Sequence, residues 1–354
     1  MNPAEKLAAQ SEGSIRGANA ARVTLSKTIT ACLILLLLLV LTLFATSLLG
    51  SERLPALASA CALSTLGKYA CGLSPNQAAI LFEIRLPRIL LAGAVGCSLA
   101  AAGASYQALL RNPLAEPYLL GISNGAAVGT MMALLFFGGY EWSRPLLAFS
   151  GALLATLVVY RLAQGRAGAS PERLILSGVI VTTFLSSAIV FVTTMLDATR
   201  IRSFTFWLLG DLSGTSSSLL TVTIFVAIAG AAFLAANARS LNLMMLGERD
   251  AFDLGVEVTR VRLIVFIAAS LLVGSSVASS GSVGYVGLVV PHLVRLSLGS
   301  DNRIAIPAAA ICGAIFVVVA DTVARTVIAP RELPVGAITA LIGAPLFIYL
   351  LKRG

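Results

Sequence analysis

Charge is scarce in this sequence. Asp, Glu, Lys and Arg make up 12% of its 354 residues, whereas a typical soluble domain carries about 25%. Hydrophobic residues make up 58%, and the mean hydropathy is +0.93. This composition excludes a soluble globular domain, a disordered chain and a disulfide-stabilised scaffold. Unbroken apolar runs such as residues 30–49 also exclude a transmembrane β-barrel, whose strands alternate apolar and polar residues.

Side chains that bind metals or nucleotides are rare as well. The single histidine, His292, excludes a histidine metal cluster, and the five cysteines contain no C-x-x-C pair. No G-x-x-x-x-G-K-[ST] loop is present, so the chain should bind no nucleotide itself. Gly121–Gly125 matches the G-x-S-x-G pattern of hydrolases, but it lies in an apolar helix without a histidine base. We therefore expect no metal site, no bound cofactor and no catalytic residue, and the chain is not expected to be an enzyme.

Long apolar runs are abundant instead. A spanning helix needs about 20 apolar residues, and the sequence predicts an all-α polytopic membrane protein with about ten spans. The eighth span has the weakest pattern, because it is short, begins among glycines and contains Pro291. The predicted spans are residues 28–49, 88–110, 114–137, 145–162, 174–196, 218–237, 261–279, 284–298, 304–327 and 335–351.

The net charge of +9 would indicate nucleic acid binding in a soluble protein. In a membrane protein it reflects the excess of Lys and Arg in cytoplasmic loops, so we expect no nucleic acid partner. With ten spans and a cytoplasmic N-terminus, most of the 25 Lys and Arg residues fall on the inner side. Both termini are therefore predicted to be cytoplasmic, with residues 1–27 as an N-terminal tail and residues 28–354 as one transmembrane domain.

Two segments between the spans carry distinctive residues. Residues 50–87 form a long outer loop with Cys61 and Cys71, for which a disulfide and two free thiols both remain open. Residues 238–260 form the most charged inner segment, and its apolar residues predict two short amphipathic helices broken at Gly247. This inner segment is either a solvated loop or a docking element for a cytoplasmic partner.

Within the spans, glycines and charged residues give further signals. Gly121, Gly125 and Gly129 recur at every fourth residue, which predicts close packing against a neighbouring helix. Asp321 and Arg325 are four residues apart on a helix and can pair. Such a pair is either functional or a structural ion pair at the helix end.

Several long segments, read in order, resemble one known family. It is the inner-membrane permeases of binding-protein-dependent ABC importers for iron-siderophores, haem and cobalamin, the FecCD and BtuC type. The resemblance runs from about residue 80 to the C-terminus. It is carried by RNPLAEPYLLGISNGAAVG at 111–129, GLVVPHLVR at 287–295, ADTVAR at 320–325 and ELPVGAITALIGAP at 332–345.

The resemblance implies an architecture and a set of partners. Spans 2–5 and 7–10 would form inverted repeats, as in many transporters. Two permease copies, most simply a homodimer, would sit in the lipid of the bacterial inner membrane. Two cytoplasmic P-loop ATPase subunits would bind ATP and Mg²⁺, and a periplasmic or extracellular binding protein would deliver the substrate.

The resemblance also implies roles for individual residues. The match is poor for Ser170 at the expected inner gate, because Pro171 and Glu172 follow it. Arginines at the outer helix ends would be exposed and would pair with glutamates of the binding protein. The residues concerned are Leu246, Gly247, Glu248, Leu254 and Gly255 for ATPase coupling, Arg85, Arg88 and Arg325 for binding-protein docking, and Asn112, Leu114 and Ser170 for the inner gate.

The substrate is less well specified. The stretch from Ile201 to Gly210 resembles haem and siderophore members, and Arg200 and Arg202 could meet an anionic chelate. We therefore expect an iron chelate, with cobalamin as the alternative. A different class, an ion-coupled secondary transporter, would need acidic groups inside the membrane, and Asp321 is the one candidate.

Overall fold

The computed structural model describes residues 25–353, apart from 51, 53, 66, 68, 70, 138–141, 166–167 and 214–215. Most of the predicted tail, residues 1–24, lies outside the described residues. Residues 25–27 belong to the first described helix, α2 (Leu25–Leu48).

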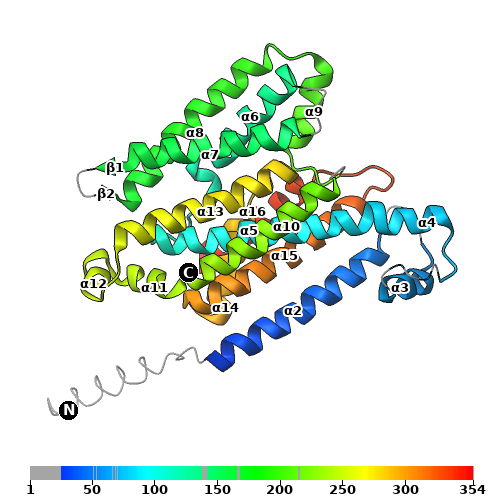
Figure 1. Ribbon diagram of the computed structural model, residues 1–354, viewed down its shortest axis with the longest axis horizontal. Coiled ribbons are helices and arrows are strands. Elements are labelled where there is room, and N and C mark those ends of the chain that lie inside the picture. Colours follow the sequence, from blue (N-terminus) through cyan, green and yellow to red (C-terminus); the bar gives the residue numbers. More distant parts are fainter. Residues whose placement is uncertain are drawn as a thin grey trace.

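The ten predicted spans all correspond to helices (Figure 1). Among the described residues, seven helical segments are long and apolar enough to cross a membrane, and three apolar helices are shorter. The all-α membrane fold is therefore confirmed. After α2 these helices are α5 (Leu86–Leu109), α6 (Ile122–Phe136), α7 (Ser143–Ala163), α8 (Pro171–Thr193), α10 (Ser217–Ala236), α13 (Val258–Ser280), α14 (Val286–Leu298), α15 (Asn302–Thr326) and α16 (Val335–Arg353).

Shorter elements connect the spans. They are α3 (Ala56–Ser64), α4 (Pro75–Ala79), the π-helical segment η1 (Ile80–Arg85), the 3-10 turn η2 (Pro117–Leu120), the two-residue strands β1 (Gln164–Gly165) and β2 (Gly168–Ala169), α9 (Ala198–Leu208), α11 (Ala238–Leu246) and α12 (Glu248–Asp253). In the segment before the second span, Cys61 and Cys71 form a disulfide, which settles the pairing that the sequence left open.

Two helix starts differ from the sequence prediction. The second span is helical from Pro75, because α4, η1 and α5 form one continuous helix of 35 residues. The wide π turn before Pro87 accommodates the missing backbone N–H, so the proline does not end the helix. The third span begins later than predicted, at Ile122, because the chain first passes through η2 and a left-handed Gly121.

The helices have two distinct ends. Figure 1 shows α11, α12, the start of α2 and the end of α16 at one end, on the left, which we call the α12 end. It shows α3, α4 and the loop of residues 327–334 at the opposite end, which we call the α3 end. The first and last spans therefore begin and finish at the same end, as an even number of spans requires.

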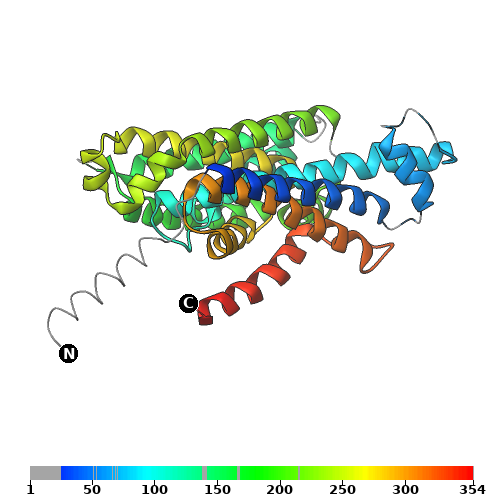
Figure 2. The same ribbon diagram turned by 90° about the horizontal axis from the view of Figure 1, so that it is seen from below.

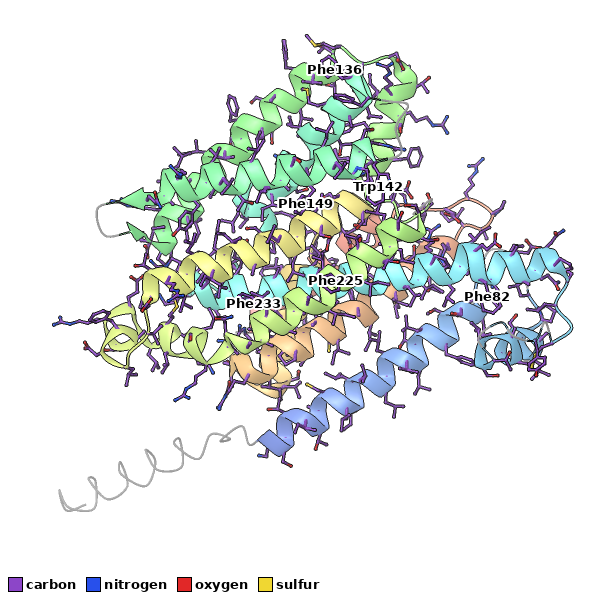
Figure 3. All side chains as sticks on the ribbon, viewed as in Figure 1. Phe82, Phe136, Trp142, Phe149, Phe225 and Phe233 are labelled. Carbon is purple, nitrogen blue, oxygen red and sulfur yellow. A yellow bond between two sulfur atoms is a disulfide. The ribbon has the colours of Figure 1, made fainter. Side chains whose placement is uncertain are left out.

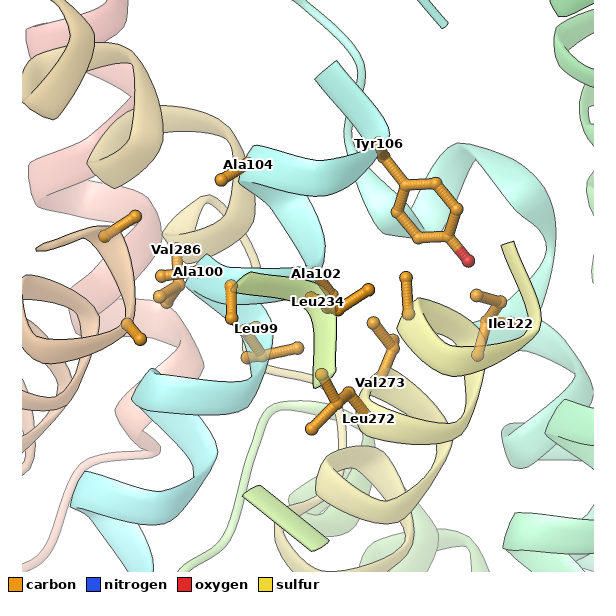
Figure 4. Close-up of a cluster of buried hydrophobic side chains, with 14 of the residues drawn as sticks. Leu99, Ala100, Ala102, Ala104, Tyr106, Ile122, Leu234, Leu272, Val273 and Val286 are labelled. Carbon is orange, nitrogen blue, oxygen red and sulfur yellow. The ribbon is translucent and has the colours of Figure 1, made fainter. Parts of the chain in front are cut away.

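The centre of the bundle is α5, which is buried along almost its whole length. Its small residues, including Ala100 and Ala104, let α10, α13, α14 and α15 pack around it (Figure 4). Tyr106 is fully buried at the contact with α13, where its hydroxyl group lies 2.5 Å from that of Ser270.

Equivalent helices of the two predicted repeats make equivalent contacts, as inverted repeats predict. Helix α5 packs on α15 as α13 packs on α7, and α6 packs on α7 as α14 packs on α15. Gly125 and Gly129 of α6 touch the backbone of α7 at Gly151 and Leu147, so the predicted close packing of this helix is confirmed for these two glycines. Figure 2 shows α16 standing out from the side of the bundle.

One of the close backbone contacts of the core joins α5 to α15 at Gly96 and Gly313. A methyl group on Gly96 would run into the backbone carbonyl of Gly313, which cannot move aside as a flexible side chain could. We therefore expect Gly96→Ala to lower the free energy of unfolding by about 2 kcal/mol or more.

The measurement is chemical or thermal unfolding of the purified protein in detergent. Gly284→Ala is the matched control, since a methyl group there meets no atom within 4 Å. It should change stability by less than about 0.5 kcal/mol. Equal stability of the two variants would show that the α5–α15 approach is looser than described.

Candidate functional site

The segment predicted for ATPase coupling folds as two short helices, α11 and α12, separated at Gly247. Gly247 and Gly255 have φ values of +146° and +85°, which favour glycine and let the chain turn before and after α12. Leu246 (67% exposed), Phe252 (71%) and Leu254 (60%) form what we call the apolar ridge. These large apolar side chains stay uncovered at the α12 end, whereas Leu241 and Met244 of α11 are buried.

A buried arginine fastens this unit to the bundle. Arg262 of α13 is 3% exposed and donates hydrogen bonds to the Glu248 carboxylate and to the backbone carbonyl of Ala169. The same carboxylate lies 3.9 Å from the guanidinium of Arg111, in the turn after α5. We call Glu248, Arg262 and Arg111 the Glu248 junction.

The Glu248 junction brings the predicted coupling residues next to both predicted gate segments. Asn112, directly after Arg111, accepts a hydrogen bond of 2.9 Å from the backbone N–H of Leu114, which fixes the turn. Ser170, directly after Ala169, caps α8 by accepting a bond from the N–H of Arg173. Leu114 is exposed and Ser170 half-buried at this end.

A second network attaches α11 to the other half of the chain, and the sequence analysis missed it. Asn242 of α11 donates to the Asp301 carboxylate at 2.7 Å, and its amide oxygen accepts from the buried Asn302. Arg295 bonds Asn302 and the carbonyl of Ala104 in α5. Burial works against ionisation of Asp301, yet hydrogen bonds from Arg303 and Asn242 hold its pKa below the usual value. An Asp-Asn pair directly before a predicted span was the available signal.

At the α3 end, the arginines predicted to be exposed for docking are buried. Arg85, Arg88 and Arg325 are 4%, 9% and 4% exposed. Arg85 donates to the carbonyls of Ser47 and Glu52, where it closes the end of α2. The expectation of exposed arginine forks was therefore wrong, because internal acceptors already cover these guanidinium groups.

Asp321 holds the other two arginines together. Its fully buried carboxylate accepts from Arg88 at 3.0 Å and from Arg325 at 2.9 Å. Arg88 also reaches Glu332 in the loop after α15, at 2.6 Å. The pair that the sequence predicted between Asp321 and Arg325 is thus confirmed, as part of a larger cluster that joins α5, α15 and this loop.

Comparison with known proteins identifies the family. Residues 32–353 match the FecCD transport family.

The chain belongs to the FecCD transport family.

Named relatives agree with this assignment. The chain is 41% identical over 281 residues to the cobalamin import system permease protein BtuC of Halobacterium salinarum, covering 79% of this chain and 75% of that relative. It is 40% identical over 279 residues to the hemin transport system permease protein HmuU of Yersinia pestis, covering 77% and 83%. A solved inward-facing ABC transporter, assigned to the metal-chelate type, matches with a TM-score of 0.79 and 30% identity, over 91% of this chain and 99% of that one.

As a FecCD member, the chain is a multi-pass permease subunit of an ABC importer for cobalamin, haem or metal chelates, and it is not itself an enzyme. The names of its relatives include both cobalamin and hemin, so they do not decide between these substrates. An importer of this class works with an ATPase, which binds the ATP, and with a binding protein.

The geometry of Asp321 also argues against ion coupling in this FecCD permease. A proton-carrying or sodium-carrying acid must be able to exchange its bound cation. Asp321 instead has one arginine on each carboxylate oxygen. Both carboxylate oxygens are thus occupied by arginine side chains, which leaves no oxygen free to bind another cation.

The Asp321 cluster gives a stability prediction. Asp321→Asn removes the carboxylate shared by two buried arginines, so that Arg325 loses its acidic partner and Arg88 keeps only the partly exposed Glu332. We expect it to lower the free energy of unfolding by about 3–5 kcal/mol. The measurement is the unfolding of the purified protein in detergent.

The control is Glu332→Gln, whose side chain is 44% exposed and partly screened by water. It should cost no more than about 1 kcal/mol. If the two variants lost equal stability, the burial of Asp321 would not be what makes the cluster strong.

Proposed function

We propose that this permease moves an iron chelate, a siderophore complex or haem, from a binding protein outside to the cytoplasm, driven by an ATPase docked at its α12 end. The observation that carries the coupling half of this proposal is the Glu248 junction. It joins the exposed α12 unit to the turn at Arg111 and to the segment before Ser170.

The apolar ridge is the surface we assign to the ATPase. Three large apolar side chains rarely stay uncovered on charged helices unless a partner buries them. The unit reaches the first half of the chain at Arg111 and, through Arg262, at the Ala169 carbonyl. It reaches the second half through Arg262 of α13 and through Asn242. A displacement of α12 would therefore reach both halves, because packed interfaces move between discrete arrangements.

Placing the ATPase at the α12 end also sets the orientation of the permease in the membrane. If the ATPase binds the α12 end, that end and both termini face the cytoplasm, as the excess of Lys and Arg predicts. The α3 end then receives the binding protein. We retain binding-protein docking at this end, with the buried Arg85, Arg88 and Arg325 holding the helix ends in place and the exposed Arg331 free to contact the partner.

We infer that a second copy of the chain completes the pathway. Helix α16 stands apart from the bundle and exposes Leu341 and Ile348 (Figure 2). Helix α8 exposes hydroxyl groups in the middle of a spanning helix, among them Thr183 and Ser187, whose protons bond to its own backbone. These hydroxyl groups lie beside exposed apolar side chains such as Ile180 and Phe184, a mixed surface that suits contact with a second copy and with a chelate.

Two features favour a chelate of negative charge. From Leu176 to Thr193 the exposed side chains of α8 carry no charge, so this part of the helix offers contact without a strong ligand for the metal. At the α3 end, Arg202 of α9 is exposed and lies 5.9 Å from the ring of Phe206. An exposed cation near an entrance attracts anions. Cobalamin is the second candidate, because the chain is as similar to cobalamin permeases as to a hemin permease.

The coupling assignment is tested with Leu246→Asp, which places a charge in the apolar ridge. We expect the ATPase to detach in a pull-down assay and ATP-driven uptake into proteoliposomes to stop. Leu296→Asp is the control, since that leucine of α14 is 64% exposed and lies outside the ridge. Normal ATPase binding by Leu246→Asp would mean that the docking surface lies elsewhere.

A second variant separates ATPase binding from the transmission of its movement to the permease. Glu248→Gln keeps the ridge but weakens the charged bonds to Arg262 and Arg111, so the ATPase should stay bound while uptake falls by about tenfold or more. Loss of ATPase binding in this variant would contradict a role for Glu248 in transmission.

The substrate is tested by uptake of a radiolabelled ferric siderophore, haem and cobalamin with the partner binding protein. We expect uptake of an iron chelate, and Arg202→Gln should slow it most at low salt, where charge attraction is least screened. Uptake of cobalamin alone, unaffected by Arg202→Gln, would establish the second candidate instead.

A further inference from the structure

A polar pocket at the α3 end is not used by the proposed coupling or docking surfaces. It has a volume of about 220 Å³ and lies between the starts of α7 and α10, helix α9 and the end of α13. Both tryptophans of the chain, Trp142 and Trp207, line it. Tryptophan side chains gather where lipid headgroups meet the hydrocarbon, and the pocket opens at the ends of spanning helices.

The pocket contains one cation and one carboxylate that are not paired with each other or with any described charged group. Arg144 forms no ion pair among the described residues. Asp211 accepts two bonds from Ser213 on Oδ1, at 2.8 and 2.6 Å, while Oδ2 has no hydrogen-bond partner in the described part of the chain. The backbone N–H of Asp211 bonds the Ser280 carbonyl at 2.8 Å, which holds this carboxylate against the end of α13.

An apolar groove runs along the same two helices, away from the pocket. It has a volume of about 440 Å³ between α10 and α13, and small residues such as Ala229, Gly230 and Ala268 form part of its lining. Figure 3 shows Trp142 near the α3 end, with Phe225 and then Phe233 farther along α10 toward the α12 end.

The dimensions of pocket and groove match a lipid. Leu219 of the pocket and Phe233 of the groove are separated on α10 by about 21 Å at 1.5 Å per residue. One leaflet of hydrocarbon is about 15 Å thick. The groove begins at Phe225, about 9 Å along α10 from Leu219, so the acyl chain of a lipid held in the pocket would lie along the near part of the groove.

We propose that the pocket and the groove together bind one phospholipid with a zwitterionic ethanolamine headgroup. The guanidinium of Arg144 suits the phosphate, which it can bind through two parallel hydrogen bonds. The free oxygen of Asp211 suits the ammonium group, which donates hydrogen bonds that a choline group cannot. An anionic headgroup without an ammonium would meet Asp211 as a like charge.

The experiment uses the intact permease in a mild detergent. Phosphatidylethanolamine, phosphatidylcholine and phosphatidylglycerol are added separately, and bound lipid is counted by native mass spectrometry. We expect one tightly held phosphatidylethanolamine per chain. Binding should fall by about tenfold for Arg144→Gln, which removes a charge-assisted bond. Asp211→Asn should abolish the preference for ethanolamine over choline.

Matched controls separate the site from general lipid affinity. Arg331→Gln removes an exposed arginine at the same end but outside the pocket, and it should bind like the wild type. Ala229→Leu fills the groove and should reduce binding of all three lipids, whereas Ala236→Leu, farther along α10 and outside the groove, should not.

A fluorescence measurement gives an independent readout. Because both tryptophans line the pocket, phosphatidylethanolamine brominated near the ester end of its chains should quench the intrinsic fluorescence, and less so in Arg144→Gln. Equal binding of the three lipids by the wild type would overturn the proposal. So would wild-type binding by Arg144→Gln, or occupation of the groove by a second copy of the chain.

Discussion

The approach of α5 to α15 at Gly96 and Gly313 is the contact on which the rest of the bundle depends. In lipid there is little hydrophobic drive between helices, so close backbone packing must hold them together. Glycine at both positions lets the two backbones touch. Helix α5 then becomes the axis around which α10, α13 and α14 pack, and its position sets where the turn at its end meets α12.

At each end of the bundle, one carboxylate is shared by two arginines. At the α12 end, Glu248 is shared by Arg262 and Arg111, and at the α3 end, Asp321 is shared by Arg88 and Arg325. Each carboxylate joins segments that are distant in sequence, so each cluster costs stability when one member is removed. The difference is exposure: Asp321 is fully buried, whereas the Glu248 side chain is 41% exposed. The Asp321 cluster is therefore suited to a fixed contact, and the Glu248 junction to a contact that a partner can displace.

Much of this architecture could be predicted from the sequence, and the failures have physical causes. The ten helices follow from hydropathy, and the break at Gly247 follows from one glycine within an amphipathic pattern. The burial of Arg88 could not be predicted, because its partner Asp321 lies 233 residues away and only the folded bundle brings them together. The helix before Pro87 was also missed, since a π turn that accommodates a proline leaves no clear sequence pattern.

The attachment of α11 and α12 has a mechanical consequence. A docking helix joined to one half of the permease would push that half alone. Here Asn242 binds the segment between α14 and α15, while Glu248 binds α13 and, through Arg262, the carbonyl of Ala169 before α8. The unit therefore sits across the two halves that form the predicted repeats. If the ATPase docks on this unit, as we propose, a small displacement of it would change the relative position of the two halves, which alternating access requires.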